Sequence, residues 1–392
     1  MSSKSLVNLR RLMIGVTASG STPLITGQLS FFSARGWDCT LVVPVDQKVR
    51  EFCTAESADW LDVKMDREIA PIRDFLSLST LLWSLLRRKP DVVNFGTPKM
   101  GLLGMLASFL ARVPARFYTC RGFRYEHEKG LKRRILMWTE RVSGFCAHRI
   151  ICISPSVRER GVEDGVFDPE KTVVIGPGSS NGVDIERFDR TRVDNATVGN
   201  LRKDLNLEGR MVLGFVGRLV DRKGVLELYS AYRVLKEEGR AVSLVLLGSL
   251  FESQFAHRWL LDEFQSDPHV HWVGFQNEVP EYMALFDVFV MPAWWEGFGN
   301  VLVQAAAMGI PVISTRVTGC RDAVNDGVNG VLVEKGDIEG LAAAIRRYLD
   351  DGDLRRRHGE AGVAWAHRFR SEIIWNGLEE IYLSQLSVTA KG

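Results

Sequence analysis

Two cations follow a predicted strand near the middle of the chain, at a spacing that suits a diphosphate. The segment GFVGRLVDRKG begins in this strand, places Gly217 and Arg218 at the strand end, and has Lys223 five residues later, before a predicted helix. A guanidinium offers a planar fork of donors and an ammonium offers a point charge, so the two could bind a diphosphate together. Ligands of open α/β sheets gather at such strand ends. Taken alone, the same residues fit a solvated surface loop equally well.

A second polar site follows the predicted strand VFVMP. Glu296 comes just after this strand, and residues 297–300 then open an apolar helix. The first backbone N–H groups of this helix would point toward the same space as Glu296 and attract phosphate or sugar oxygens. These N–H groups lie near Asn300 and Val301. Gln304 lies on the helix eight residues beyond Glu296, within reach of a bound ligand. In the alternative interpretation Glu296 only caps the helix and Gln304 is a surface residue.

A weaker candidate is the loop GVTASGSTPLITG near the N-terminus. It places Gly15, Gly20 and Gly27 between a predicted strand and a predicted helix. Small residues there let the backbone approach a ligand closely. The spacing differs from the GxGxxG pattern, however, and an ordinary strand-to-helix turn explains it equally well.

The chain alternates strands and helices that could hold these sites. Predicted strands begin at Leu12, Cys39, Asp91, Ala115, Arg149 and Thr172, with helices near residues 24–35, 71–89, 99–112, 131–145 and 155–163. After a polar stretch at about 185–210, interpreted as a linker, strands begin at Val212, Ser243, Val270, Val288 and Pro311. The pattern predicts an α/β protein with two doubly wound, Rossmann-like domains at residues 1–188 and 189–370. A C-terminal helix at 371–392 either follows the second domain or returns to the first.

Composition places the chain among ordinary globular proteins and shows an uneven charge distribution. Its 392 residues contain 46% hydrophobic and 25% charged side chains, with a net charge of +2. Residues 87–149 carry 14 basic and 4 acidic side chains, however. The longest apolar run is too short for a spanning helix, no signal peptide is apparent, and the six cysteines form no CxxC pair. We therefore expect a cytoplasmic protein with reduced thiols.

The basic region includes an amphipathic helix. Residues 129–145 place apolar side chains at helical spacing with basic residues between them. The apolar positions are Leu131, Ile135, Trp138 and Val142, and the basic ones are Lys132, Arg133, Arg134 and Arg141. Such a helix could rest on anionic lipid headgroups. Packing on its own sheet, with the basic residues in solvent, is the equally weighted alternative.

Over nearly its whole length the sequence resembles the family 4 retaining glycosyltransferases of the GT-B fold. GFVGRLVDRKG looks like the family's diphosphate-binding segment, EGFGNVLVQ like its signature of two glutamates eight positions apart, and SSNGVDIERF like the segment that closes its N-terminal domain. The resemblance implies that Arg218 and Lys223 neutralise the donor pyrophosphate, and that Glu296 binds hydroxyls of the donor sugar. Backbone N–H groups of residues 298–301 would contact sugar and phosphate.

The resemblance also locates the nucleoside, with one departure from the family pattern. Gly274 and Phe275, in the segment HWVGF, would border the base. The family has a glutamate at the position of Gln304, where its carboxylate holds the ribose hydroxyls. Glutamine keeps one acceptor oxygen but loses the charge, so nucleotide binding would be weaker or altered.

A second departure lies in the predicted N-terminal domain, in the segment YTCRGFRYE. Many relatives carry a His-Gly pair here, beside the reacting sugar, whereas this chain has Arg121 before Gly122. An arginine cannot act as a neutral imidazole, but it could stabilise a phosphate or an anionic acceptor. His127 is close in sequence, and its spacing favours a surface position over a substitute role.

The expected function is transfer of a sugar from a nucleoside diphosphate donor to a hydroxyl acceptor, with retention of anomeric configuration. By resemblance the N-terminal domain binds the acceptor, a glycan or lipid-linked sugar of polysaccharide biosynthesis, and the C-terminal domain binds the donor, with UDP the best base assignment. A hexosyl or N-acetylhexosaminyl transferase is expected, on the inner membrane face, with Arg218, Lys223, Glu296 and Arg121 as catalytic residues. No cofactor, metal or nucleic acid is expected. A nucleotide-sugar epimerase and a non-catalytic scaffold are the alternatives.

Overall fold

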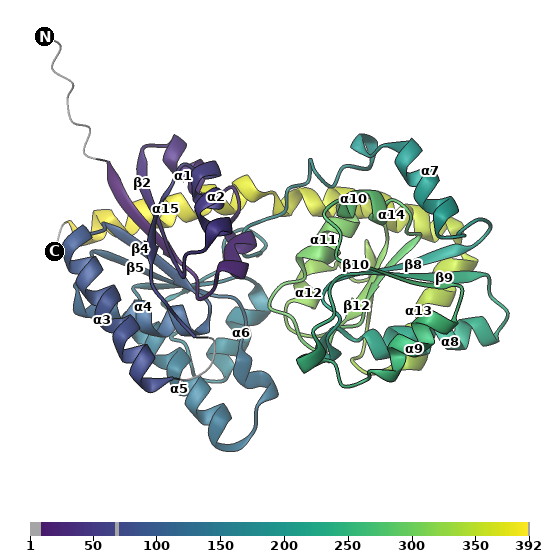
Figure 1. The fold of residues 1–392 in the computed structure, drawn as a ribbon, viewed down its shortest axis with the longest axis horizontal. Coiled ribbons are helices and arrows are strands. Elements are labelled where there is room, and N and C mark those ends of the chain that lie inside the picture. The colour runs from purple at the N-terminus through teal and green to yellow at the C-terminus, as the bar shows by residue number, and fades with distance from the viewer. Residues whose placement is uncertain (1–8, 67–69, 391–392) are drawn as a thin grey trace, which may run out of the picture. The chain divides into compact units, whose positions relative to one another are not determined.

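The computed structural model describes residues 9–66 and 70–390, which divide into two compact units (Figure 1). The N-terminal unit comprises Met1–Asn181 and Glu372–Gly392, and the C-terminal unit comprises Gly182–Ser371. Each unit contains one parallel sheet whose strand order reverses direction beside its first strand. With right-handed crossovers this order places helices on both faces of each sheet. The predicted fold class of two doubly wound α/β domains is confirmed.

Seven strands form the N-terminal sheet, in the order β3-β2-β1-β4-β5-β6-β7. Their bounds are Arg10–Gly15 (β1), Trp37–Val43 (β2), Asp59–Asp62 (β3), Val92–Gly96 (β4), Ala115–Cys120 (β5), Arg149–Cys152 (β6) and Thr172–Val173 (β7). β3 was not predicted from the sequence. This edge strand has four residues with an aspartate at each end, a composition with little strand propensity. Its pairing with β2 supplies what the local sequence lacks.

The α-helices of the described N-terminal unit are α1 (Gln28–Ala34), α2 (Gln47–Ala55), α3 (Pro71–Arg88), α4 (Pro98–Leu110), α5 (Gly130–Cys146), α6 (Pro155–Glu163) and α15 (Ser371–Thr389). α4 packs against both α3 and α5, so these three helices form one layer (Figure 1). The C-terminal helix α15 packs within the same unit. The Tyr382 ring stacks on Phe32 of α1 at 5.6 Å, and the Tyr382 hydroxyl accepts a hydrogen bond from Asn94 at 2.6 Å.

Six strands form the C-terminal sheet, in the order β10-β9-β8-β11-β12-β13. They are Met211–Val216 (β8), Val242–Leu247 (β9), Val270–Gly274 (β10), Val288–Met291 (β11), Val312–Thr315 (β12) and Gly330–Val333 (β13). The helices are α7 (Asn195–Asp204), α8 (Val225–Glu237), α9 (Trp259–Ser266), α10 (Val279–Met283), α11 (Asn300–Ala307), α12 (Cys320–Ala323), α13 (Ile338–Asp350) and α14 (Gly352–Ala366). β13, a four-residue edge strand, was not predicted from the sequence.

The interpretation of residues 185–210 as a linker is wrong. Within that stretch α7 begins after Asp194, whose carboxylate accepts hydrogen bonds from the backbone N–H groups of Ala196 and Thr197 at 3.1 Å each. α7 then packs on α10 within the C-terminal unit. Its polar composition reflects exposure to solvent, since none of its residues is buried.

No helix in the described part of the chain is both long enough and apolar enough to cross a bilayer. All six cysteines are buried and carry free thiols.

Candidate active site

The loops after β8 and β11 are joined at the carboxyl edge of the C-terminal sheet. The short helical turn Asp221–Lys223 follows β8, and the backbone N–H of Trp294, after β11, donates to the carbonyl oxygen of Arg222 at 2.8 Å. Gly224 ends this turn with a φ of +73°, and a Cβ there would collide with the carbonyl oxygen of Pro292. The glycine therefore permits the two loops to approach, which brings together side chains far apart in sequence.

Lys223 and Glu296 form a largely buried ion pair between these loops, with side chains 11% and 18% exposed. The Lys223 ammonium donates a short hydrogen bond to Glu296 Oε2 and lies 3.6 Å from the Met291 sulfur. The Arg222 guanidinium lies 3.5 Å from the same carboxylate oxygen. Burial alone would raise the pKa of Glu296, but the charges of Lys223, Arg222 and Arg218, with the Lys223 hydrogen bond, hold it below its usual value. Glu296 is thus a carboxylate at neutral pH.

Arg222 is a site residue that the sequence analysis missed. Its guanidinium also lies 5.0 Å from the centroid of the Trp295 ring. Its position next to Lys223, in the cation-containing segment GFVGRLVDRKG, is the sequence signal that could have identified it.

Arg218 lies at the surface, at the end of β8. Its guanidinium is 4.9 Å from the centroid of the Phe251 ring, which comes from the loop after β9. Next to it, the backbone N–H of Gly217 donates to the Leu247 carbonyl at 2.9 Å. A Cβ on Gly248 would collide with the Gly217 carbonyl oxygen, so two glycines allow these strand ends to approach closely.

The end of β10 adds the predicted base-binding residues to the same edge. The backbone N–H of Gly248 donates to the Gly274 carbonyl at 2.7 Å, and Gly274 has a φ of +71°. Phe275 follows with its side chain 69% exposed. Because β10, β9, β8 and β11 are neighbours in the sheet, the strand ends that carry Gly274, Gly217 and Glu296 lie along one edge.

The helix predicted after Glu296 is α11, which begins at Asn300 with Gly299 at its N-cap. Phe298 is buried, with its ring 5.4 Å from that of Phe369. A Cβ on Gly319 would collide with the Gly297 carbonyl oxygen, so α12 approaches this loop closely. Val301 and Gln304 follow on α11, both half-buried, with Gln304 one turn beyond Asn300.

Arg121 belongs to the N-terminal unit, at the end of β5. Its Nε donates to the Ser180 hydroxyl at 2.7 Å, while its buried Nη1 has no hydrogen-bond partner within the described residues. Burial lowers the pKa of Arg121 to about 10, so it remains a cation. A Cβ on Gly96 would collide with Nη1, so the glycine at the end of β4 makes room for this guanidinium. His127 is exposed in the short helical turn that follows.

Gly15 also lies in the N-terminal unit, at the end of β1. A Cβ there would come within 2.6 Å of the Phe95 ring, so packing alone requires the glycine. The nearby N-terminus of α1 is already occupied, because Glu56 accepts hydrogen bonds from the backbone N–H groups of Gly27 and Ser30 at 2.6 and 3.0 Å. Among the predicted nucleotide-binding residues, Gly15 is the one outside the C-terminal unit, and its role stays a prediction.

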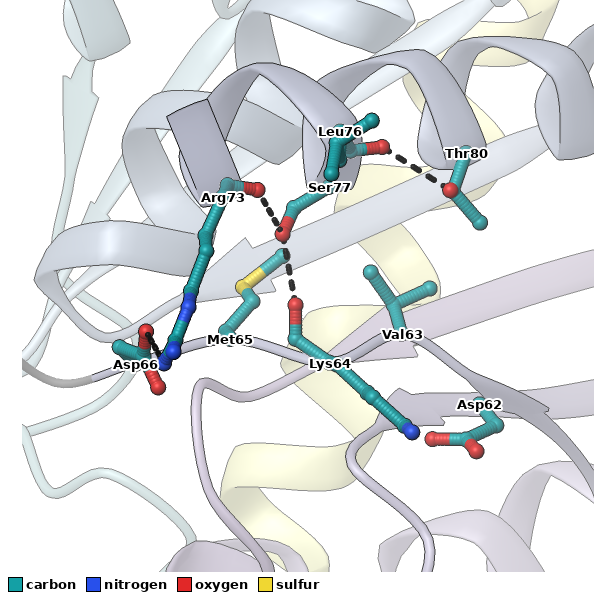
Figure 2. A pocket seen from close by; sticks show the side chains of 9 residues that line it. All are labelled: Asp62, Val63, Lys64, Met65, Asp66, Arg73, Leu76, Ser77 and Thr80. Atoms are coloured by element: carbon teal, nitrogen blue, oxygen red, sulfur yellow. Dashed lines mark hydrogen bonds and ion pairs between the residues drawn. The ribbon is translucent and has the colours of Figure 1, made fainter. Parts of the chain in front are cut away.

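A cavity of about 530 Å³ lies in the N-terminal unit, between the segment after β3 and the start of α3 (Figure 2). The Ser77 hydroxyl joins its two sides, with contacts of 2.6 Å to the Lys64 carbonyl and 2.8 Å to the Arg73 carbonyl. Arg73 forms an ion pair with Asp66 at 2.9 Å. The lining includes none of the predicted site residues, so we locate the candidate active site by the strand-end geometry instead.

Comparison with known proteins identifies the family of the chain. Two family models match, Glycosyl transferases group 1 over residues 198–365 and Glycosyl transferase 4-like domain over residues 20–178. The capsular polysaccharide biosynthesis glycosyltransferase CapM of Staphylococcus aureus is 35% identical over 94% of this chain and 95% of its own. The UDP-Gal:alpha-D-GlcNAc-diphosphoundecaprenol alpha-1,3-galactosyltransferase of Escherichia coli is 30% identical over 73% of each chain.

The fold has counterparts among solved structures. HepE of Anabaena, solved in complex with UDP, superimposes with a TM-score of 0.79 at 20% identity, over 96% of this chain and 100% of HepE. That likeness shows the shared GT-B fold, and the match to CapM over almost the full length of both proteins shows the family. The chain therefore belongs to the group 1, or GT4, glycosyltransferases, which are nucleotide-sugar-dependent, retaining enzymes.

Proposed function

We propose that this glycosyltransferase moves a hexose or N-acetylhexosamine from a UDP-sugar to a lipid-linked sugar, in bacterial surface polysaccharide biosynthesis. The observation that carries the proposal is the largely buried Lys223–Glu296 pair, with Arg218 beside it, at the carboxyl edge of the C-terminal sheet. This arrangement places cations where a diphosphate leaving group would gain charge, next to a carboxylate that accepts hydrogen bonds from sugar hydroxyls.

In this proposal Arg218 and Lys223 bind the pyrophosphate, and Glu296 binds the donor sugar. Arg218 is exposed and can close on a phosphate, whereas Lys223 is held in place by Glu296. Backbone N–H groups at the start of α11 add donors toward sugar and phosphate. The base lies beside Gly274 and Phe275, and the ribose beside Gln304. Leaving-group stabilisation rests on these protein cations, with no metal ion assigned a role.

The acceptor proposal draws on the relatives and on Arg121. The E. coli relative acts on a sugar linked to diphosphoundecaprenol. An acceptor of that kind carries phosphates, and a phosphate oxygen beside Arg121 would supply the hydrogen-bond partner that Nη1 lacks among the described residues. A lipid-linked acceptor also requires the enzyme to work at a membrane surface, so we propose a peripheral position on the cytoplasmic membrane.

A panel of nucleotide sugars tests the proposal. The purified protein is incubated with each donor and with a polyprenyl-diphosphate-linked sugar, and the products are separated by chromatography. Release of UDP together with a longer lipid-linked glycan is expected, with the anomeric configuration of the donor preserved by NMR. Conversion of the donor to its epimer without release would favour an epimerase. Donor binding without turnover on any acceptor would favour a scaffold.

A further inference from the structure

The outer face of α3 is apolar, which reverses the usual pattern of a helix packed on a sheet. Its large side chains point away from the sheet and are between 53% and 80% exposed. They are Ile72, Phe75, Leu76, Trp83 and Leu86. At 100° per residue these five positions fall within an arc of about 100°. The opposite face buries Ser77 and Ser84 beside Leu81 and Leu85. A surface helix normally turns its apolar side inward, so this stripe calls for a partner.

α5 carries a second stripe of the same kind. Leu131, Ile135, Trp138 and Phe145 are between 41% and 73% exposed, at spacings of four, three and seven residues. The inward face again holds small or polar side chains, including Ser143 and Gly144. This helix is the one that the sequence analysis singled out as amphipathic, and the structure shows that its apolar side faces outward.

The two stripes belong to one surface. α4 packs between α3 and α5, and the three helices cover the same face of the N-terminal sheet (Figure 1). The outer sides of helices in one layer point away from their sheet in the same general direction. Phe109 and Leu110 at the end of α4 are exposed as well, and the Phe109 ring lies 5.8 Å from that of Phe145. We call the exposed apolar residues of α3 and α5 the α3/α5 surface.

The charged side chains on α3 and α5 themselves are mostly positive. α3 contributes Arg73, Arg87 and Arg88, and α5 contributes Lys132, Arg133, Arg134 and Arg141. Four of these cations pair with carboxylates of neighbouring segments: Arg73 with Asp66, Arg88 with Asp59, Lys132 with Glu128 and Arg133 with Asp164. The two helices, both fully described, contain two acidic residues, and neither is free to repel an anion. Asp74 is paired with Lys99 at 2.7 Å, and Glu140 is buried. Arg87 lies over the Trp83 ring, at 5.0 Å from its centroid, so a cation directly contacts the apolar stripe of α3.

We propose that the α3/α5 surface docks on an anionic lipid bilayer. Tryptophan, phenylalanine and leucine would enter the boundary between headgroups and acyl chains, while the flanking arginines and lysines extend to the phosphates. The positive charge selects an anionic membrane over an apolar protein partner. The inference deepens the proposed function and rests on it for the lipid-linked acceptor. It adds α3 as a binding element beside α5.

Vesicle cosedimentation of the full-length protein tests this proposal. Vesicles of phosphatidylcholine mixed with phosphatidylglycerol should bind the protein, and vesicles of phosphatidylcholine alone should bind it at least about tenfold more weakly. Binding should fall as salt rises, because headgroup attraction is screened. The double variant Trp83→Ser with Leu86→Ser should reduce binding roughly tenfold, and Leu131→Ser with Trp138→Ser similarly, because both lose buried apolar area. Lys132→Gln with Arg134→Gln should weaken binding to anionic vesicles only.

Matched controls lie on the C-terminal unit. Trp259 is 51% exposed on α9, and Arg356 is an exposed cation on α14. Trp259→Ser and Arg356→Gln therefore remove the same kinds of side chain outside the α3/α5 surface, and both variants should bind vesicles like the wild type. Each variant should keep the wild-type melting temperature and turnover on a short-chain, water-soluble acceptor. That assay separates the two claims, since turnover by the wild-type protein without any binding of it to anionic vesicles refutes the docking surface and leaves the transferase intact.

Three results would overturn the proposal. Equal binding to neutral and anionic vesicles would remove the electrostatic basis. Unchanged binding in both double variants would place the contact elsewhere. If sedimentation velocity shows a dimer that the Trp83→Ser with Leu86→Ser variant dissociates, while vesicle binding is unchanged, the surface joins two copies of this chain instead.

Discussion

At the scale of single residues, the least expected feature is Gln304, because a carboxylate there could accept charge-assisted hydrogen bonds from ribose. Such bonds are roughly twice as strong as neutral ones. If the ribose lies against this position, Gln304→Glu should keep or tighten donor binding, by about 1 kcal/mol at most. Calorimetric titration of a UDP-sugar into both proteins measures the change. A clear loss of affinity would refute the ribose role and point to a pocket rebuilt around an amide.

A second residue-scale prediction concerns Glu140 on α5. Burial raises the pKa of Glu140 to about 7, against the opposing effect of the hydrogen bond that the Tyr118 hydroxyl donates at 2.7 Å. The folded state therefore holds a proton that the unfolded state releases near the ordinary carboxyl pKa. This contribution to stability is complete at low pH and is lost as pH rises through about 7.

Glu140→Gln should remove that pH dependence while keeping an acceptor for Tyr118. The free energy of unfolding of the variant, relative to the wild type, should rise between about pH 5 and about pH 8, by at most about 3 kcal/mol. Urea unfolding at the two pH values measures it. A difference that is constant across this range would show that Glu140 titrates normally.

Only part of the chemistry of single residues could be predicted from the sequence, because some contacts join residues that are far apart in the chain. Lys223, Glu296 and Arg218 stand out because cations and a carboxylate follow strands, where ligands collect. Glu56 could not be found that way, because its hydrogen bonds to the start of α1 depend on the packing of α2. The space that Gly96 leaves for Arg121 could not be predicted either, because the ends of β4 and β5 are adjacent only in the sheet.

At the scale of elements, the turn between β8 and α8 determines where Lys223 lies. Gly224→Ala would force a Cβ into the Pro292 carbonyl at a positive φ, and should lower stability by more than Gly239→Ala. Gly239 is the matched control, since its φ of +77° is similar and no atom lies within 4 Å of its Cβ position, so roughly 1 kcal/mol of backbone strain is expected there. Thermal unfolding compares them.

Gly224→Ala should also reduce transfer activity, because the displaced turn carries Lys223 away from Glu296. Equal losses of melting temperature in the two variants, with full activity in Gly224→Ala, would show that the close approach of the two loops is unimportant.

Element prediction succeeded where the local pattern was strong. β8 and β11 are continuous apolar runs and β9 is interrupted only by Ser243, and α3 to α6 lie within a few residues of their predicted ranges. β3 and β13 were missed because short edge strands depend on a neighbour for their hydrogen bonds. α7 was missed because its polar composition resembles that of a linker, while its capping by Asp194 is a local signal that could have been recognised.

At the scale of the whole molecule, the two-sheet architecture was predictable, and the contribution of the C-terminal helix was open. α15 belongs to the N-terminal unit through contacts such as the bond from Trp37 Nε1 to Glu379 at 3.0 Å, 342 residues away in the chain. Nor could the sequence show that the apolar stripes of α3 and α5 face solvent. Periodicity shows that apolar residues share a helix face, but only the packed layer shows which face turns outward.

The most direct test of the central claim is a transfer assay on the residues assigned to the pyrophosphate. Wild type, Arg218→Ala and Lys223→Ala are compared at saturating UDP-sugar with a lipid-linked acceptor, and kcat is measured by UDP release. Arg233→Ala, an exposed cation on α8, is the control. The account predicts that kcat falls roughly 10²- to 10³-fold in the Arg218 and Lys223 variants, since each loses a group that stabilises the leaving diphosphate, while Arg233→Ala matches the wild type. Unchanged kcat in Arg218→Ala and Lys223→Ala, with both proteins folded, would contradict it.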